Sequence, residues 1–358
     1  MTGGIYVHIP FCRSRCAYCS FYSISTGKLP KTAEFGTAII AHLDSFGKID
    51  PFPVNSVYFG GGTPSLFPAT FFSRILDMLS QRFSLTKEVE VTIEMNPEDA
   101  DTQYLTSLKQ AGINRISIGV QSADDQILKT LNRRHSAETA ILAIKNARSE
   151  FQNVSCDLII GVKGESEDEK KILRQLPLTE LSHISVYMLD GEKNRPFSAT
   201  DDHTANLYLK LCDFLEYSGF HQYEISNFAR QGMESVHNRH YWKGDPYIGL
   251  GPSAHSLLYP FRIWDHSGIK RFLSGDFRRG KMKYNRKMFV SEMLMLGLRL
   301  REGIKAADFS ARFGTDLFRE FGWLCDRFPG YVIRDKAGIR LSRPGMLVSN
   351  EIFQELLQ

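Results

Sequence analysis

The chain has 358 residues, of which 42% are apolar and 23% charged, and its formal net charge at pH 7 is +4. These values indicate a globular protein, built as one large domain or as a large domain with a smaller one attached. The small charge does not by itself indicate nucleic-acid binding, and no apolar run reaches the roughly 18 residues of a membrane-spanning helix. The N-terminal sequence MTGGIYVHIPFC lacks the features of a signal peptide, so we expect a cytoplasmic protein with reduced thiols.

The first half of the sequence alternates short β-rich runs with segments of helical periodicity. The predicted strands are 5–9, 56–61, 90–97, 115–122, 154–162 and 183–189. The predicted helices between them are 68–82, 101–111, 136–150 and 165–176. Repeated strand–helix units favour an α/β fold with parallel strands, and several apolar runs suggest strands covered on both faces. This periodicity fits both a doubly wound sheet and an incomplete barrel.

The second half begins with a predicted helix over 201–219, followed by an irregular, aromatic-rich stretch. From 285 the pattern changes to predicted helices over 287–299, 306–313 and 316–326, a hairpin over 331–342 and a last helix from about 344. We therefore divide the chain into a main α/β domain, a connecting region and a small winged-helix-like α+β domain, with the bounds 1–219, 220–284 and 285–358. Because the charges of the last segment are mixed and no basic recognition helix stands out, we expect no nucleic-acid partner.

Three of the six cysteines, Cys12, Cys16 and Cys19, are close together near the N-terminus. The others are scattered in apolar or helical surroundings, which predicts small buried side chains: Cys156, Cys212 and Cys325. Three thiolates just after a strand suit a soft metal or an iron–sulfur cluster. A structural zinc site would need a fourth Cys or His at a standard spacing, which this loop lacks. A set of three ligands leaves one coordination position open for an exogenous group.

The spacing CxxxCxxC, with Tyr18 before the last cysteine, resembles the cluster motif of the radical S-adenosylmethionine (SAM) superfamily. Further segments follow in the order of that superfamily's motifs: YFGGGTPS (58–65), IEMNPE (93–98), RISIGVQS (115–122) and CDLIIG (156–161). Each lies at the C-terminal end of a predicted strand, where α/β barrels build their sites. The resemblance implies that residues 1–219 form an incomplete (β/α)6 TIM-like barrel.

The resemblance also implies the cofactors. Cys12, Cys16 and Cys19 would hold a [4Fe–4S] cluster whose fourth iron binds SAM, and a reduced cluster would release a 5′-deoxyadenosyl radical from it. The glycines would allow close backbone approach, and Glu94 would accept hydrogen bonds from the ribose. The residues implied to bind SAM are Tyr6, Tyr18, Gly61, Gly62, Thr63, Glu94, Gln121, Arg133 and Asp157. The sequence assigns no further catalytic residue.

The sequences YVHIPFC, GGGTPS and IGVQS…LNRRHS are similar to the group of oxygen-independent coproporphyrinogen III oxidases. Those oxidases carry a further cysteine two positions after the third, where this chain has Phe21, which argues against that activity. The sequence HNRHYW (237–242) resembles the HNxxYW motif of HemW-type haem chaperones. This resemblance implies that haem is bound by His237 as an axial ligand, together with Asn238, Tyr241 and Trp242. The alternative is an ordinary hydrogen-bonded histidine with core aromatics.

Two functions remain. The first is a chaperone that holds haem and passes it to haem-requiring proteins, especially those of respiration, with SAM as a conformational or redox switch. The resemblance to these chaperones also implies cluster-dependent homodimerisation and a membrane-associated haem acceptor. The second is a radical enzyme that acts on a porphyrinogen, which the complete set of cofactor residues favours and Phe21 opposes.

Overall fold

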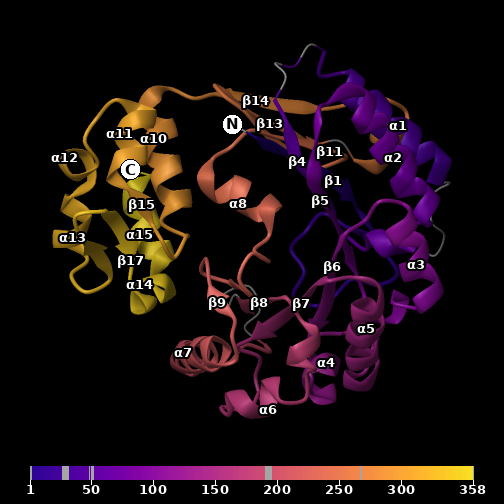
Figure 1. The fold of residues 1–358 in the computed structure, drawn as a ribbon, viewed down its shortest axis with the longest axis horizontal. Coiled ribbons are helices and arrows are strands. Elements are labelled where there is room, and N and C mark those ends of the chain that lie inside the picture. Colours follow the sequence, from indigo (N-terminus) through magenta and orange to yellow (C-terminus); the bar gives the residue numbers. More distant parts are fainter. Residues whose placement is uncertain are drawn as a thin grey trace.

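The computed structural model describes residues 2–25, 32–47, 49, 52–189, 196–266 and 268–357. In this part of the chain, a 12-stranded sheet has the order β14–β13–β12–β11–β1–β4–β5–β6–β7–β8–β10–β9. Six strands that are consecutive in this order pair in parallel: β1 (Gly3–Ile9), β4 (Val54–Gly61), β5 (Leu85–Met95), β6 (Arg115–Gln121), β7 (Asn153–Ile160) and β8 (His183–Met188). The sheet curves around a central lumen (Figure 1), which confirms the incomplete barrel.

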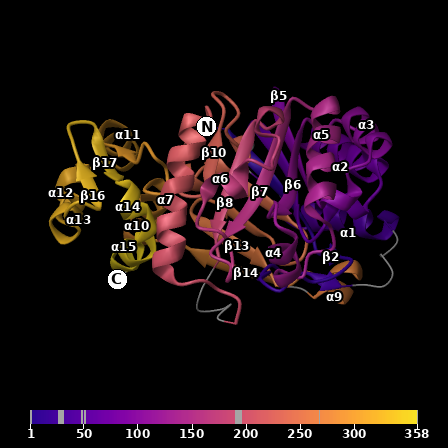
Figure 2. The ribbon, with the colours of Figure 1, turned by 90° about the horizontal axis from the view of Figure 1, so that it is seen from below.

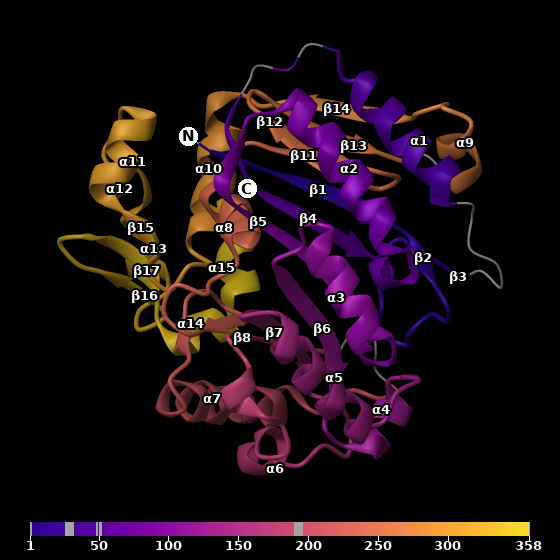
Figure 3. The same ribbon diagram turned by 45° about the vertical axis from the view of Figure 1, so that its right-hand side comes forward.

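Helices cover the outer face of the curved sheet (Figure 3). They are α1 (Thr32–Asp44), α2 (Ala69–Arg82), α3 (Thr102–Gln110), α4 (Asp125–Thr130), α5 (Ala137–Glu150), α6 (Glu169–Leu173) and α7 (Asp201–Tyr217). Most match the predicted helices within two residues at each end, but α6 is shorter than the predicted 165–176. Helices α1 and α4 were not predicted, because the buried face of α1 includes Gly36 and His42 besides apolar residues and α4 has only six residues.

The six strands alternate between apolar residues that face the helices and polar residues that face the lumen. On β6, Ile116 and Ile118 are fully buried in the main hydrophobic core. On the opposite face of β6, Arg115 lies 3.9 Å from the carboxylate of Glu90, and Ser117 also has a polar partner. The prediction of strands with two apolar faces is therefore wrong. A barrel buries one face of its sheet under helices and keeps the other for side chains that fill the lumen.

Residues 220–284 extend the same sheet and are not irregular. Strand β11 (Tyr247–Leu250) pairs in parallel with β1, on the side away from β4. Antiparallel strands add to both edges: β12 (His255–Leu258), β13 (Phe261–Asp265), β14 (Arg279–Lys283), β10 (Asn227–Ala229) and β9 (His221–Gln222). The segment also contains α8 (Val236–Lys243) and α9 (Ile269–Leu273). Strands of two to five residues are too short to show the alternation on which sequence prediction relies.

The C-terminal segment forms a small α+β unit with its own hydrophobic core, as predicted. Its described elements are α10 (Arg286–Gly297), β15 (Ile304–Lys305), α11 (Ala306–Phe313), α12 (Leu317–Phe321), α13 (Trp323–Arg327), β16 (Val332–Arg334), β17 (Gly338–Leu341), α14 (Arg343–Leu347) and α15 (Ser349–Leu356). The predicted helix 316–326 is interrupted at Gly322. Helix α7 lies between this unit and the barrel (Figure 2), and Arg343 pairs with Asp213 and Glu216 of α7. None of the described helices is long and apolar enough to cross a membrane.

Replacement of Phe72 by alanine tests the packing of α2 on the sheet. Phe72 is fully buried, and its ring meets the ring of Phe59 on β4 edge to face at 4.9 Å. We expect Phe72→Ala to lower the free energy of unfolding by about 3–5 kcal/mol, because the cavity it leaves cannot fully collapse. Denaturant unfolding measures this loss. Tyr217→Ala is the control: Tyr217 is 92% exposed, and its loss should change stability by less than about 0.5 kcal/mol.

Candidate functional site

A cavity of about 400 Å³ lies at the C-terminal ends of the parallel strands. The structure brings together here nearly all the residues predicted to bind the cluster or SAM: Cys12, Cys16, Tyr18, Cys19, Gly61, Gly62, Thr63, Glu94, Gln121, Arg133 and Asp157. Tyr6 is the exception, because it lies deeper in the lumen, with its hydroxyl 3.0 Å from Nδ1 of His8. The volume is in the range of sites that bury a small cofactor.

The cysteines lie on the loop that follows β1. Cys12 belongs to the short strand β2 (Phe11–Cys12), which pairs in parallel with β3 (Ile24–Ser25) and so closes the loop. The backbone N–H of Ala17 donates to the carbonyl of Leu131 at the end of α4, which ties the middle of the loop to the barrel. Burial raises the pKa of both Cys12 and Cys19. Iron would offset this cost, because a metal binds the thiolate and stabilises it.

The cysteine loop offers three sulfur donors to a metal centre. Among the described residues, no group of three His, Cys, Asp or Glu side chains is arranged to hold a single metal ion. A [4Fe–4S] cluster does not require such convergence, because each thiolate binds a different iron. The three cysteines are free thiols, each partly exposed, and all line the same cavity. The loop therefore fits a cluster with three protein ligands better than it fits a mononuclear metal.

Arg133 lies beside the cysteine loop and is held by several acceptors. Its Nη1 is 3.2 Å from Sγ of Cys16, and its Nη2 donates to Oδ1 of Asn96 and to the carbonyl of Gly119 at 2.8 and 2.7 Å. Its Nε is buried and has no partner among the described residues. The guanidinium lines the cavity, and its positive charge suits a ligand carboxylate.

The glycine motif is needed for packing as well as for a ligand. Gly61 has φ +115°, and a Cβ there would lie 2.5 Å from the ring of His8. A Cβ on Gly62 would lie 2.7 Å from the carbonyl oxygen of Phe11. The end of β1 therefore occupies the space over these residues, and any side chain would push the cysteine loop away. Backbone approach to a cofactor is thus not the only reason for glycine here.

Glu94 extends from β5 into the lumen. Its Oε1 accepts from the hydroxyl of Tyr58 at 2.9 Å and its Oε2 from the backbone N–H of Gly61 at 3.0 Å. Burial, and then the nearby Asp157, raise the pKa of Glu94 to about 7. Two donors thus orient a carboxylate whose charge is costly, and hydrogen bonds from ribose hydroxyls would lower that cost.

Two further predicted residues lie on neighbouring strands. Asp157 accepts from the hydroxyl of Ser117 at 3.1 Å, and burial raises its pKa. Gln121 ends β6 with φ +68°, a left-handed conformation that residues other than glycine rarely adopt. Backbone strain of this kind concentrates at ligand sites, where the surrounding structure holds it in place.

Sequence reasoning missed several residues that line the cavity: Met95, Asn96, Glu98, Ser117, Tyr187, Met188 and Leu189. Two features of the sequence could have identified some of these cavity residues. Asn96 directly follows β5 in the IEMNPE segment, and Tyr187 is on the same face of β8 as His183 and Ser185 by alternation. The apolar members remained hidden because a methionine or leucine at a strand end looks like an ordinary core residue.

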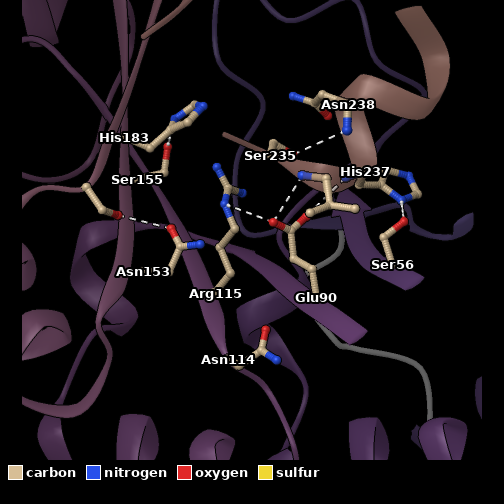
Figure 4. Close-up of polar contacts among 12 residues, drawn as sticks. Ser56, Glu90, Asn114, Arg115, Asn153, Ser155, His183, Ser235, His237 and Asn238 are labelled. Atoms are coloured by element: carbon tan, nitrogen blue, oxygen red, sulfur yellow. Dashed lines mark hydrogen bonds and ion pairs between the residues drawn. The ribbon is translucent and has the colours of Figure 1, made fainter. Parts of the chain in front are cut away.

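The residues predicted to bind haem are not in this cavity. They belong to α8, which lies against the opposite, N-terminal ends of the strands (Figure 4). The carboxylate of Glu90 on β5 accepts from the backbone N–H groups of Val236 and His237, both at 3.1 Å, at the start of the helix. Arg115 lies on the other side of Glu90. Helix α8 therefore closes the bottom of the lumen.

His237 is 1% exposed, and both of its ring nitrogens have partners. Nδ1 lies 2.9 Å from Oγ of Ser56 on β4, and Nε2 lies 2.8 Å from the hydroxyl of Tyr241 on the same helix. Burial lowers the pKa of His237 to about 3, so the imidazole is neutral. In this conformation His237 matches the alternative of an ordinary hydrogen-bonded histidine, and iron ligation would require Tyr241 to leave Nε2.

The other residues of the motif connect α8 to its surroundings. The backbone N–H of Asn238 donates to Oγ of Ser235, which caps the helix. The ring of Tyr241 meets that of Tyr247 on β11 edge to face at 4.6 Å. The guanidinium of Arg299 lies 4.3 Å from the ring centre of Trp242. The indole Nε1 of Trp242 is buried and has no partner in the described part of the chain.

The raised pKa of Glu94 predicts how stability depends on pH. An unfolded glutamate ionises near pH 4.5, whereas the folded protein keeps the Glu94 proton up to about pH 7. The folded state thus binds more protons in this window, and stability falls as the pH rises through it. We expect Glu94→Gln to reduce the fall in unfolding free energy between pH 5 and 7 by about 1–2 kcal/mol.

Unfolding measured across this pH range would check the Glu94 prediction. Glu165, whose pKa is also raised to about 7, remains in both proteins and contributes to the background slope together with the other buried titratable groups. The exposed substitution Glu88→Gln is the control and should leave the slope unchanged. If the unfolding free energy of Glu94→Gln falls between pH 5 and 7 as much as that of the wild-type protein, the prediction is contradicted.

Comparison with known proteins agrees with this geometry. The family model described as "Radical SAM superfamily" matches residues 6–176, and the model "HemN C-terminal domain" matches residues 284–348. The chain is 32% identical to "Radical S-adenosyl methionine domain-containing protein 1, mitochondrial" of Danio rerio, over 100% of this chain and 87% of the relative. It is 29% identical to "Heme chaperone HemW" of Bacillus subtilis (strain 168), over 98% of each chain.

A solved structure supports the fold. The coproporphyrinogen III oxidase HemN from Escherichia coli, described as a radical SAM enzyme, superimposes with a TM-score of 0.83. The alignment covers 99% of this chain and 89% of that one, at 21% sequence identity. The chain therefore belongs to the radical SAM superfamily and is of the HemN and HemW type.

Proposed function

We propose that this protein is a haem chaperone that carries a [4Fe–4S] cluster and SAM and delivers haem to haem-requiring proteins. The observation that carries the proposal is the sequence HNRHYW on α8, in a chain similar over its full length to a protein named haem chaperone HemW. The buried Trp242 Nε1 adds support, because a haem propionate would supply the acceptor that this donor lacks. Haem binding by the motif then requires α8 to rearrange, so that Nε2 of His237 is freed.

The cofactor end of the barrel has a separate role. Cys12, Cys16 and Cys19 would hold the cluster, which supplies an electron and an open iron when it is bound. Arg133 would bind the carboxylate of SAM and Glu94 its ribose. The remaining predicted residues would line the cofactor: Tyr6, Tyr18, Gly61, Gly62, Thr63, Gln121 and Asp157. In a chaperone this site acts as a conformational or redox switch for haem transfer.

Phe21 distinguishes this function from porphyrinogen oxidation. It is 65% exposed at the mouth of the cavity, at the position where the oxygen-independent oxidases have their additional cysteine. A phenyl group offers no metal ligand and no redox chemistry. One observation still favours the oxidase-like alternative: nearly all the predicted cofactor residues line the cavity.

We also propose a compartment, haem acceptors and an oligomeric state for this protein. A cluster held by partly exposed thiols is best kept in a reducing compartment such as the cytoplasm. We propose that the haem acceptors are respiratory proteins at the membrane and that the protein dimerises when its cluster is present. We also propose that residues 1–219, 220–284 and 285–358 are functionally distinct. They form a cofactor domain, a region with the HNxxYW motif and a C-terminal domain.

The cluster prediction is tested by substitution of single cysteines. After anaerobic reconstitution with iron and sulfide, we expect Cys16→Ala to lose most of the bound iron and acid-labile sulfide, because one of three ligands is missing. Cys325→Ala is the matched control, since this thiol is also partly exposed but lies in α13, outside the cavity. Equal iron binding by the two variants would exclude the assignment.

Haem binding is tested with two histidines of the same helix. His237 and His240 are both buried, and each has partners on both ring nitrogens. We expect His237→Ala to weaken haem binding at least tenfold and to change the haem absorbance spectrum, as removal of an axial ligand does. His240→Ala removes a buried, hydrogen-bonded imidazole from the same helix and should retain haem.

The same experiment separates the candidate functions. Equal loss of haem from both variants would show that the helix, and not His237, is required. Transfer of haem from the wild-type protein to an apo-haem protein would support the chaperone. Formation of 5′-deoxyadenosine that depends on a porphyrinogen, without retained haem, would instead establish the enzyme.

A further inference from the structure

Tyr58 lies between the two ends of the barrel and contacts both. It extends from β4 into the lumen, between Ser56, which bonds to His237, and the glycine loop that follows the strand. Its hydroxyl donates to Oε1 of Glu94 at 2.9 Å. Its ring is stacked on that of His237, with centroids 5.1 Å apart and an interplanar angle of 29°. It does not line the cavity and was not among the predicted site residues.

We propose that Tyr58 is a positioning residue, which holds the Glu94 carboxylate in the orientation that receives the ribose of SAM and is itself held in place by His237 of α8. This inference rests on the proposed binding of SAM. It also gives the HNxxYW motif a second role, as the support beneath the cofactor site.

The two hydrogen bonds on Glu94 explain why the hydroxyl matters. The carboxylate oxygens are held by donors from different places, Tyr58 inside the lumen and the backbone N–H of Gly61 at its mouth. Together they fix the plane of the carboxylate and leave its other lone pairs for a ligand. Without the hydroxyl, one oxygen loses its partner and the side chain can rotate about the remaining bond.

The ring of Tyr58 cannot move freely, because aromatic groups surround it. Besides His237, the ring of Tyr6 lies 6.1 Å away at an angle of 33°. Tyr6 in turn lies 6.2 Å from His237, so the three rings form one layer across the lumen. His237 is fixed below by Ser56 and by the bond of its backbone N–H to Glu90. The position of the Tyr58 hydroxyl is thus set by the helix that closes the barrel.

The experiment combines the variant Tyr58→Phe with a change in the ligand. Binding of SAM, and of a SAM analogue without the 2′- and 3′-hydroxyl groups of the ribose, is measured by calorimetry on the cluster-loaded full-length protein under anaerobic conditions. The hydroxyl acts only through the contact of Glu94 with the ribose. We therefore expect Tyr58→Phe to weaken SAM binding about tenfold and binding of the analogue less than about twofold.

Two controls address folding and specificity. Tyr104→Phe also removes a tyrosine hydroxyl with one acceptor, the carbonyl of Phe67 at 2.7 Å, but it lies on α3 away from the cavity. Tyr104→Phe should leave the affinities for SAM and for the analogue unchanged. In a Glu94→Ala background, Tyr58→Phe should have little further effect, because the side chain that the hydroxyl positions is absent. Thermal unfolding of each variant reports whether the fold is intact.

The outcomes distinguish the inference from the function on which it rests. If the wild-type protein does not bind SAM, the proposed cofactor is wrong, and Tyr58 has no ligand to serve. If it binds SAM, equal weakening for SAM and the analogue in Tyr58→Phe would overturn the positioning role, because a general structural defect does not distinguish ribose hydroxyls. If Tyr58→Phe binds SAM and the analogue as tightly as the wild-type protein does, the positioning role is overturned as well.

Discussion

The polar lumen of the barrel is the constraint on which the rest of the structure depends. Each parallel strand turns its apolar face to the helices, and its polar side chains therefore meet in a confined space at the centre. Buried polar groups must find partners or they destabilise the fold. Glu90 and His183 have such partners at the bottom of the lumen, and Glu94 and Asp157 have them near the top.

The two layers meet the requirement in different ways. At the bottom, the peptide N–H groups at the start of α8 satisfy Glu90, whereas Nε of Arg115 is buried 3.9 Å from Glu90 without a hydrogen-bond partner among the described residues. Near the top, burial raises the pKa of Glu94 and of Asp157, and Arg133 keeps a buried N–H without a partner among the described residues. An incomplete layer of this kind is typical of a site that a ligand completes.

Helix α8 connects three parts of the molecule. His237 reaches the barrel strands, Tyr241 contacts β11, and Trp242 packs under Arg299 at the end of α10. Arg299 also lies 3.4 Å from the buried carboxylate of Glu224. A movement of this helix would therefore disturb the lumen and the C-terminal unit together. This arrangement suits a protein in which the state of the cofactor and the release of a cargo are to be linked.

Local spacing and periodicity were enough to predict the alternation of strands and helices, the cysteine loop and the small C-terminal unit. Nearly all the residues predicted to bind the cofactors do line the cavity, since motifs at strand ends converge wherever parallel strands share an edge. The sequence did not predict that residues 220–284 join the barrel sheet. Their short strands are defined by pairing with distant partners, which only the folded chain brings together. The position of His237 and the contacts of Tyr58 likewise emerge only in the folded chain. Neither the burial of an imidazole nor the stacking of two rings 179 residues apart in sequence is visible until the chain has folded.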